Sequence, residues 1–126
     1  MSKNIIVTGG AGYIGSHTVV ELVKSGFNPI IIDNFSNSSS SVIKNIEKIC
    51  KKKIDFFDLN CVDKLKMNNS VNWKKIDGII HFAALKSVSE SFEKKEKYFI
   101  NNIESTKVLL NICEIYNIEK FVFSSS

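Results

Sequence analysis

The sequence predicts an α/β fold in which a doubly wound, parallel β-sheet is covered by helices on both faces. Three observations support this prediction. Five short apolar runs, rich in β-branched and aromatic residues, recur along the 126 residues; helical patterns separate them; and most of the runs are apolar at successive positions. Strands of a parallel sheet are buried on both faces and joined by right-handed β-α-β units, which this alternation matches. The runs are residues 5–7, 30–32, 54–57, 79–82 and 121–123.

In the first half of the chain, the strands at 5–7 and 30–32 are each followed by a helical pattern. Residues 13–25 carry apolar residues at helical spacing, and Gly26 supplies a C-terminal stop. Residues 41–50 form the second predicted helix. The expected apolar faces are Ile14, Val19, Leu22 and Val23 in the first helix and Val42, Ile43, Ile46 and Ile49 in the second.

In the second half, the strand at 54–57 is followed by a weaker pattern over 60–73, which predicts a short helix and a loop. The strand at 79–82 precedes a long helix over 99–116. The chain ends directly after the strand at 121–123, so we expect a fold truncated after its fifth strand, part of something larger. The long helix has two apolar rows: Ile103, Leu110 and Cys113 form one, and Leu109, Ile112 and Tyr116 the other.

Composition excludes several classes of protein. The chain is 44% hydrophobic, and 17 basic against 13 acidic residues leave a net charge of +4. The only basic cluster, Lys51-Lys52-Lys53, is interpreted as a solvated loop, so no nucleic-acid partner is expected. The three cysteines (Cys50, Cys61 and Cys113) form no C-x-x-C pair, so neither a disulfide framework nor a metal site is expected. No apolar run reaches the ~20 residues of a membrane span, and no signal-peptide pattern opens the chain, which predicts a cytoplasmic protein without membrane partners.

A glycine-rich loop follows the first strand. The segment Thr-Gly-Gly-Ala-Gly-Tyr-Ile-Gly at 8–15 places Gly9, Gly12 and Gly15 in a G-x-x-G-x-x-G spacing. We expect Gly9 to permit the tight turn, Gly12 to let the backbone approach a pyrophosphate, and Gly15 to let the helix pack closely on the strand. The helix N-terminus would offer N–H groups to the phosphates. The alternative is a glycine-rich turn that binds nothing.

An acidic residue stands where a dinucleotide-binding fold needs one. Asp33 ends the second strand, 18 residues after Gly15, close to the ~20 expected for a ribose-binding acid. Its carboxylate would accept the ribose hydroxyls and repel a 2′-phosphate, which favours NAD over NADP. The alternative is a turn or helix-capping aspartate. Together with the glycine loop, Asp33 predicts that residues 1–126 are one NAD-binding domain of the Rossmann type, without the substrate domain and the later strands.

Four segments resemble the extended short-chain dehydrogenase/reductase family, and within it the epimerases that act on UDP-hexoses. They are the glycine loop with Ser16-His17, then Asp-Asn-Phe-Ser-Asn-Ser at 33–38, His-Phe-Ala-Ala-Leu-Lys-Ser-Val-Ser-Glu-Ser at 81–91, and Phe-Val-Phe-Ser-Ser-Ser at 121–126. The glycine loop marks the superfamily, whereas the segment at 81–91 is much more specific. The resemblance runs from residue 5 to 126 and covers about the N-terminal third of such an enzyme.

The resemblance implies a role for each matching residue. Tyr13 and Ile14 would meet the pyrophosphate through their N–H groups, Asp58 and Leu59 would flank the adenine, and Asn101 would face the cofactor from the long helix. The adenosine ribose would be surrounded by Asp33, Asn34, Asn37 and Ser38, and the nicotinamide side would be lined by Phe82, Ala83 and Lys86. Ser126 would be catalytic, bonding the sugar 4-hydroxyl and the catalytic tyrosine. Alternatives remain: Lys86 as a surface lysine, Asn101 as a solvated helix residue, and His81 as a packed strand-end residue without chemistry.

The implied activity is NAD-dependent epimerisation at C4 of a UDP-hexose through a 4-keto sugar, which interconverts UDP-glucose and UDP-galactose in galactose metabolism. It implies a homodimer when full length, and a Tyr-x-x-x-Lys pair. The one such pair present, Tyr116 and Lys120, precedes the last strand and should lie at the wrong edge of the sheet, so we expect residues 1–126 alone to be inactive. The alternatives are another nucleotide-sugar epimerase or dehydratase of this fold, or a non-catalytic NAD-binding sensor.

Overall fold

The computed structural model of the chain describes residues 2–34, 41–82 and 95–124, with the backbone alone at 95–99. They form one parallel sheet with strand order β3-β2-β1-β4-β5, as expected for a Rossmann-type fold. The strands are β1 (Asn4–Thr8), β2 (Asn28–Asp33), β3 (Asp55–Asp58), β4 (Gly78–Phe82) and β5 (Lys120–Ser124). The helices are α1 (Tyr13–Lys24), α2 (Ser41–Cys50), α3 (Lys64–Ser70), the short η1 (Trp73–Lys75) and α4 (Lys95–Tyr116). The predicted fold class and order of elements are confirmed.

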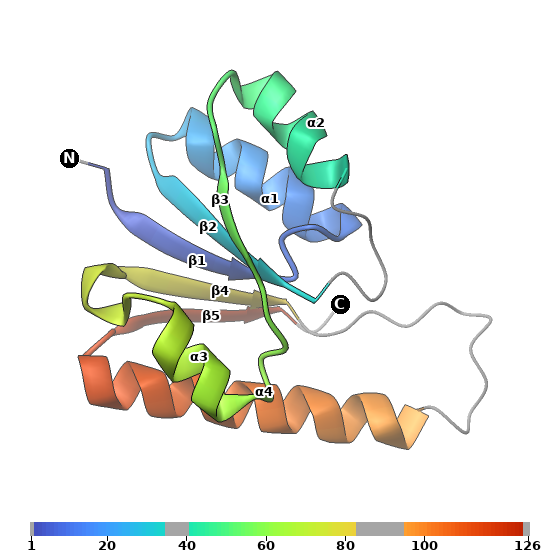
Figure 1. Cartoon of the computed structure of the whole chain (residues 1–126), viewed down its shortest axis with the longest axis vertical. Helices are drawn as coiled ribbons and strands as arrows, with labels where there is room; N and C mark the ends of the chain where they lie inside the picture. The colour runs from blue at the N-terminus through green and yellow to red at the C-terminus, as the bar shows by residue number, and fades with distance from the viewer. Residues whose placement is uncertain (1, 35–40, 83–94, 125–126) are drawn as a thin grey trace.

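Helices cover the two faces of the sheet in separate layers. α1 and α2 lie on one face, and α3 and α4 lie on the other (Figure 1). Alternate residues of β1 therefore enter different cores: Val7 packs with Val19 and Ile46, whereas Ile6 packs with Leu109 and Trp73. This two-sided burial is the physical reason for the apolar runs in the central strands.

The end of α1 confirms the stop predicted at Gly26. Gly26 has a φ of +88°, and its N–H donates to the carbonyl of Val23 at 3.0 Å. The next residue, Phe27, donates to the carbonyl of Leu22 at 2.9 Å. These two bonds form a Schellman motif, in which glycine avoids the steric penalty of the left-handed conformation. The chain is thereby turned back into β2.

Four residues that were expected on the apolar faces or rows of their helices are exposed: Ile14, Ile49, Ile103 and Leu110. Ile49 is 63% exposed, because three residues advance an α-helix by less than one turn and the series Ile43, Ile46, Ile49 drifts off the buried face. On α4, Leu109 and Ile112 are buried, whereas Ile103 and Leu110 are exposed. α4 also begins at Lys95, four residues earlier than predicted.

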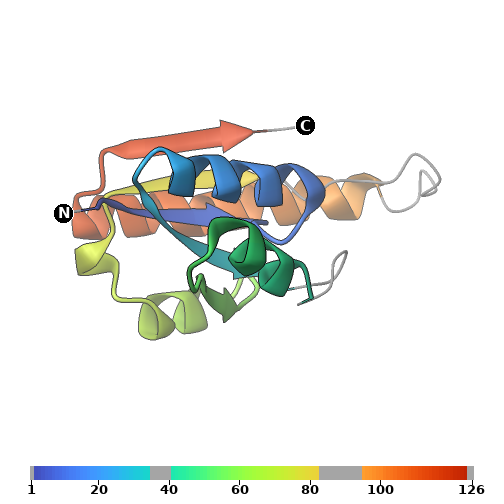
Figure 2. The ribbon, with the colours of Figure 1, turned by 90° about the horizontal axis from the view of Figure 1, so that it is seen from above.

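The outer strands are less covered than the prediction required. Val122 of β5 is 58% exposed, and Phe56 of β3 is also exposed. Seen from above, β5 runs beside α1 rather than beneath it (Figure 2). Burial on both faces is therefore limited to the central strands. No helix in the described part of the chain is long and apolar enough to cross a membrane.

Candidate functional site

The parallel strands bring most of the predicted site residues that the structure describes to one edge of the sheet. β1, β2 and β4 all end on the right in Figure 1, at the carboxyl edge of the sheet. Register places Thr8 beside His81, and Asp33 beside Asp58. Open parallel sheets bind ligands at this edge. Five predicted site residues lie outside the described residues: Asn37, Ser38, Ala83, Lys86 and Ser126.

The glycine loop has the close approaches that its spacing predicted. Gly9 has a φ of +72°, and its N–H donates to the carbonyl of Ile32 at 2.8 Å. A Cβ on Gly15 would lie only 2.1 Å from the carbonyl oxygen of Gly9. Gly15 is therefore required for α1 to pack on the loop, as expected. Sequence reasoning missed Gly10, where a Cβ would lie 2.8 Å from Cγ1 of Ile31; the Gly-Gly doublet was the available signal.

Gly12 differs from Gly15 because the packing of the protein leaves more space for a side chain at Gly12. It is the N-cap of α1 with extended backbone (φ −75°, ψ 174°), and a Cβ there would lie 3.3 Å from the carbonyl oxygen of Gly9. A small shift of the loop would accept that contact. No side chain among the described residues caps this helix end, and its first turn holds no acidic residue. The backbone N–H groups of Tyr13 and Ile14 therefore lie at an uncapped N-terminus, which favours an anion.

Asp33 contacts the glycine loop from the end of β2. Its Oδ2 accepts a hydrogen bond from the backbone N–H of Ala11 at 3.1 Å. This bond to the loop matches the alternative of a turn aspartate. It leaves room for a ribose role as well, because a carboxylate accepts about four hydrogen bonds.

Cys61, which the sequence did not single out, lies close enough to Asp33 to respond to its charge. Burial, followed by the negative charge of Asp33, raises the pKa of the Cys61 thiol to about 12. The thiol is therefore protonated and uncharged at neutral pH, and it adds no charge beside the Asp33 carboxylate.

The remaining described candidates lie in varied surroundings. Asp58 is exposed at the end of β3, and Asn34 is exposed directly after β2. Leu59 packs partly against the core beneath α3 and α4, and Phe82 against the core beneath α1 and α2. Asn101 is half-buried on the first half of α4.

His81 is buried at the end of β4, as the structural alternative predicted. Its Nδ1 pairs with Oγ1 of Thr8, and its Nε2 lies 3.2 Å from Oγ of Ser105 on α4. Burial lowers the pKa of His81 to about 4. The imidazole is therefore neutral under ordinary conditions.

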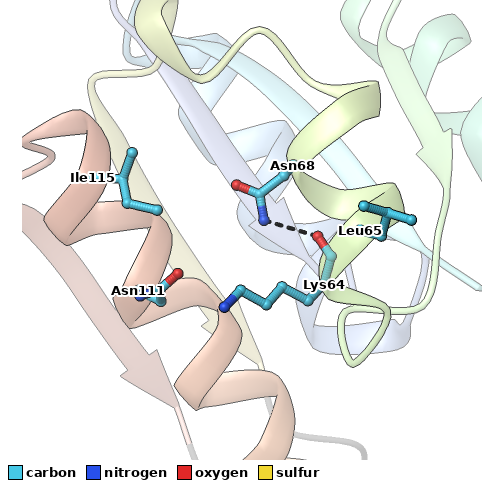
Figure 3. A pocket seen from close by; sticks show the side chains of 5 residues that line it. All are labelled: Lys64, Leu65, Asn68, Asn111 and Ile115. Carbon is cyan, nitrogen blue, oxygen red and sulfur yellow. Dashed lines mark hydrogen bonds between the residues drawn. The ribbon is translucent and has the colours of Figure 1, made fainter.

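Two other features lie away from this edge. Tyr116 ends α4, and Lys120 begins β5 opposite Gly78, the first residue of β4, so this pair lies at the amino edge as predicted. A groove of about 500 Å³ runs between α3 and α4 (Figure 3). It is lined by Lys64, Leu65, Asn68, Asn111 and Ile115, none of which is a predicted site residue.

Comparison with known proteins agrees with this geometry. Residues 6–126 match the family model described as GDP-mannose 4,6 dehydratase. A UDP-glucose 4-epimerase from Dictyostelium discoideum is 47% identical over 126 residues, which are 100% of this chain and 37% of that protein. The bifunctional protein GAL10 of Candida maltosa is 46% identical over 128 residues, 100% of this chain and 84% of that protein.

Solved structures show the same likeness. A UDP-glucose-4-epimerase from Stenotrophomonas maltophila, with bound NAD and formylated UDP-arabinopyranose, has a TM-score of 0.89 and 40% identity over 98% of this chain. The enzyme from Bifidobacterium longum, in complex with NAD+ and UDP, has a TM-score of 0.86 and 39% identity over the same share. The chain spans 37% of each of these two structures.

Proposed function

The chain belongs to the GDP-mannose 4,6-dehydratase family, and from its similarity to UDP-glucose 4-epimerases we propose that residues 1–126 are the NAD-binding domain of an enzyme that epimerises UDP-hexoses at C4. The observation that carries the proposal is the uncapped N-terminus of α1, which the glycine loop presents beside Asp33. The likeness to epimerase structures that hold NAD supports the same reading.

The described residues fit a dinucleotide. The pyrophosphate would lie on the N–H groups of Tyr13 and Ile14, where the helix dipole favours negative charge. Gly12 would leave room for the pyrophosphate, because a Cβ at this position would occupy the space of the pyrophosphate. Within the protein, that Cβ would meet only the Gly9 carbonyl oxygen, at 3.3 Å. Asp33 would hold the adenosine ribose with Asn34, Asn37 and Ser38.

The other residues would serve the adenine and the reacting end of the cofactor. Asp58 and Leu59 would flank the adenine. On the nicotinamide side, Phe82, Ala83, Lys86 and Asn101 would position the ring, and Ser126 would hydrogen-bond the sugar 4-hydroxyl. When bound, NAD supplies an acceptor and donor of hydride for sugar C4. The residues of this chain would contribute by binding the cofactor, orienting it toward the sugar and excluding water from the site.

The epimerisation needs a base, and the one Tyr-x-x-x-Lys pair in residues 1–126 does not lie at this edge. Tyr116 and Lys120 lie at the amino edge, away from the glycine loop. We therefore propose that residues 1–126 alone do not interconvert UDP-glucose and UDP-galactose. The same observation favours a second candidate, a non-catalytic NAD-binding module. For the longer enzyme we propose a homodimer in which exposed apolar residues of α4 take part: Ile100, Ile103, Leu110 and Ile115.

Calorimetric titration with NAD and NADP tests the cofactor assignment. Wild-type should bind NAD much more tightly than NADP, and Asp33→Asn should reduce that preference by roughly tenfold, because it removes a charge-assisted bond and the repulsion of a 2′-phosphate. The asparagine can still accept from Ala11, so the loop stays braced. Asp55→Asn is the matched control, since Asp55 is exposed at the amino end of β3. Equal affinity of wild-type for both cofactors would refute the assignment.

A further inference from the structure

A buried chain of hydrogen bonds joins β1, β4 and α4 beneath the proposed cofactor site. Thr8, His81 and Ser105 are buried polar residues, and each is bonded to the next. At one end the N–H of Phe82 donates to Oγ1 of Thr8 at 3.2 Å. At the other end the hydroxyl of Ser105 donates to the carbonyl of Asn102 at 3.0 Å.

The two ends allow one consistent arrangement of protons. The Ser105 hydroxyl has one proton and donates it to the Asn102 carbonyl, so Nε2 of His81 must donate to the Ser105 oxygen. The imidazole is neutral, so Nδ1 is an acceptor, and the Thr8 hydroxyl donates to it. The opposite tautomer would leave the Thr8 proton without a partner among the described residues, at the cost of an unsatisfied buried donor. The tautomer of His81 is thus set from both sides.

The chain of bonds touches segments that border the site. Thr8 directly precedes Gly9, and a Cβ on Gly9 would lie 3.4 Å from Cβ of Phe82. Phe82 is the last residue of β4, before the segment at 83–91. Ser105 bonds back to Asn102, one residue after Asn101. A shift of these hydrogen-bonded side chains would therefore move the glycine loop, the end of β4 and the first half of α4 together.

We propose that His81 is a positioning residue: as the neutral Nε2–H tautomer, it ties the ends of β1 and β4 to α4 and holds the segments around the NAD site at their correct spacing. This inference rests on the proposed function. It assigns no proton transfer to His81. Its contribution is geometric, because buried and fully satisfied polar networks specify one arrangement of the elements that they join.

Ser105→Ala tests the proposal and has a matched control in the next residue. The variant leaves the Nε2–H of His81 without an acceptor, so NAD binding should weaken by roughly 5- to 50-fold. Thr106 also donates to the Asn102 carbonyl, at 2.7 Å, whereas the hydrogen bonds of His81 within the described residues go to Thr8 and Ser105, so Thr106→Ala should bind NAD within about twofold of wild-type. Affinities are measured where the unfolding curves show each variant folded. In a double-mutant cycle, the losses of NAD affinity caused by Thr8→Val and Ser105→Ala should be non-additive. Thr8→Ser keeps the hydroxyl that Thr8→Val removes, so it should bind NAD as wild-type does.

A nuclear magnetic resonance spectrum of ¹⁵N-labelled histidine provides a readout that does not use NAD. The chain has two histidines, so His17→Gln leaves only the His81 signals. We expect a protonated Nε2 and a bare Nδ1 in wild-type, and loss of this single tautomer in Ser105→Ala. A protonated Nδ1, or unchanged NAD binding in Ser105→Ala, would overturn the inference. If wild-type itself fails to bind NAD, both the proposed function and the positioning role are refuted. If wild-type and Ser105→Ala bind NAD equally well, only the positioning role is refuted.

Discussion

Replacing Gly15 by alanine should destabilise the fold because two backbone segments meet there. The added carbon would lie 2.1 Å from the Gly9 carbonyl oxygen and 2.8 Å from its carbonyl carbon, where ordinary contact begins at 3.4 Å. Overpacking costs about 1–3 kcal/mol through shifts of side chains and backbone. At Gly15 the three nearest atoms all belong to the backbone, so no side chain can move aside. Alanine regains at most about 1 kcal/mol through its helix propensity. We therefore expect a net loss of about 3 kcal/mol, out of a total of ~5–15 kcal/mol.

Unfolding in urea, followed by tryptophan fluorescence, measures this loss. Trp73 is the only tryptophan, is buried, and donates its indole N–H to the carbonyl of Met67 at 2.8 Å. The melting temperature should fall by roughly 10 °C. Thr18→Ala is the control on the same helix, since the one bond of the Thr18 hydroxyl within the described part of the chain is to the carbonyl of Ile14; its effect should stay within about 0.5 kcal/mol. If Gly15→Ala unfolds within that same margin, the reasoning from close approach is wrong.

Four further predictions follow from the same geometry. Gly12→Ala should keep near wild-type stability but weaken NAD binding by roughly tenfold or more in calorimetry, because its Cβ occupies the space of the pyrophosphate; unchanged affinity would contradict that placement. Because burial lowers the pKa of His81 from 6.5 to about 4, the unfolded chain binds a proton that the folded chain does not, so the free energy of unfolding should fall by roughly 3 kcal/mol between pH 7 and pH 4. His81→Gln should lack this component in urea unfolding, and an identical pH slope in both proteins would count against it. Tyr116→Phe should leave the turnover of a full-length enzyme unchanged, whereas Ser126→Ala should slow it substantially; the reverse result would move the site. Residues 1–126 should sediment as a monomer, since the homodimer is proposed for the longer enzyme, and a tight dimer of residues 1–126 would contradict this prediction.

Local patterns carried most of the fold prediction. The positive φ at Gly26 and the close approach at Gly15 both depend on a few neighbouring residues, so spacing along the chain predicted them. The long helix was harder, because apolar residues surround α4 on both the buried side, with Leu109, and the exposed side, with Leu110. Periodicity identifies a helix but does not say which of two apolar faces meets the sheet.

The sequence by itself determined the order of the elements, the glycine loop and the position of Asp33 at a strand end, because backbone conformation and parallel pairing follow from local composition and periodicity. Only the tertiary structure decided what the buried polar groups contact. Thr8 and His81 are separated by 73 residues in the chain, and Ala11 and Asp33 by 22. Such pairs are brought together by strand register and loop closure, which depend on the packing of the whole sheet. The bonds of His81 to Thr8 and Ser105 also set the His81 tautomer, a property that no single residue encodes.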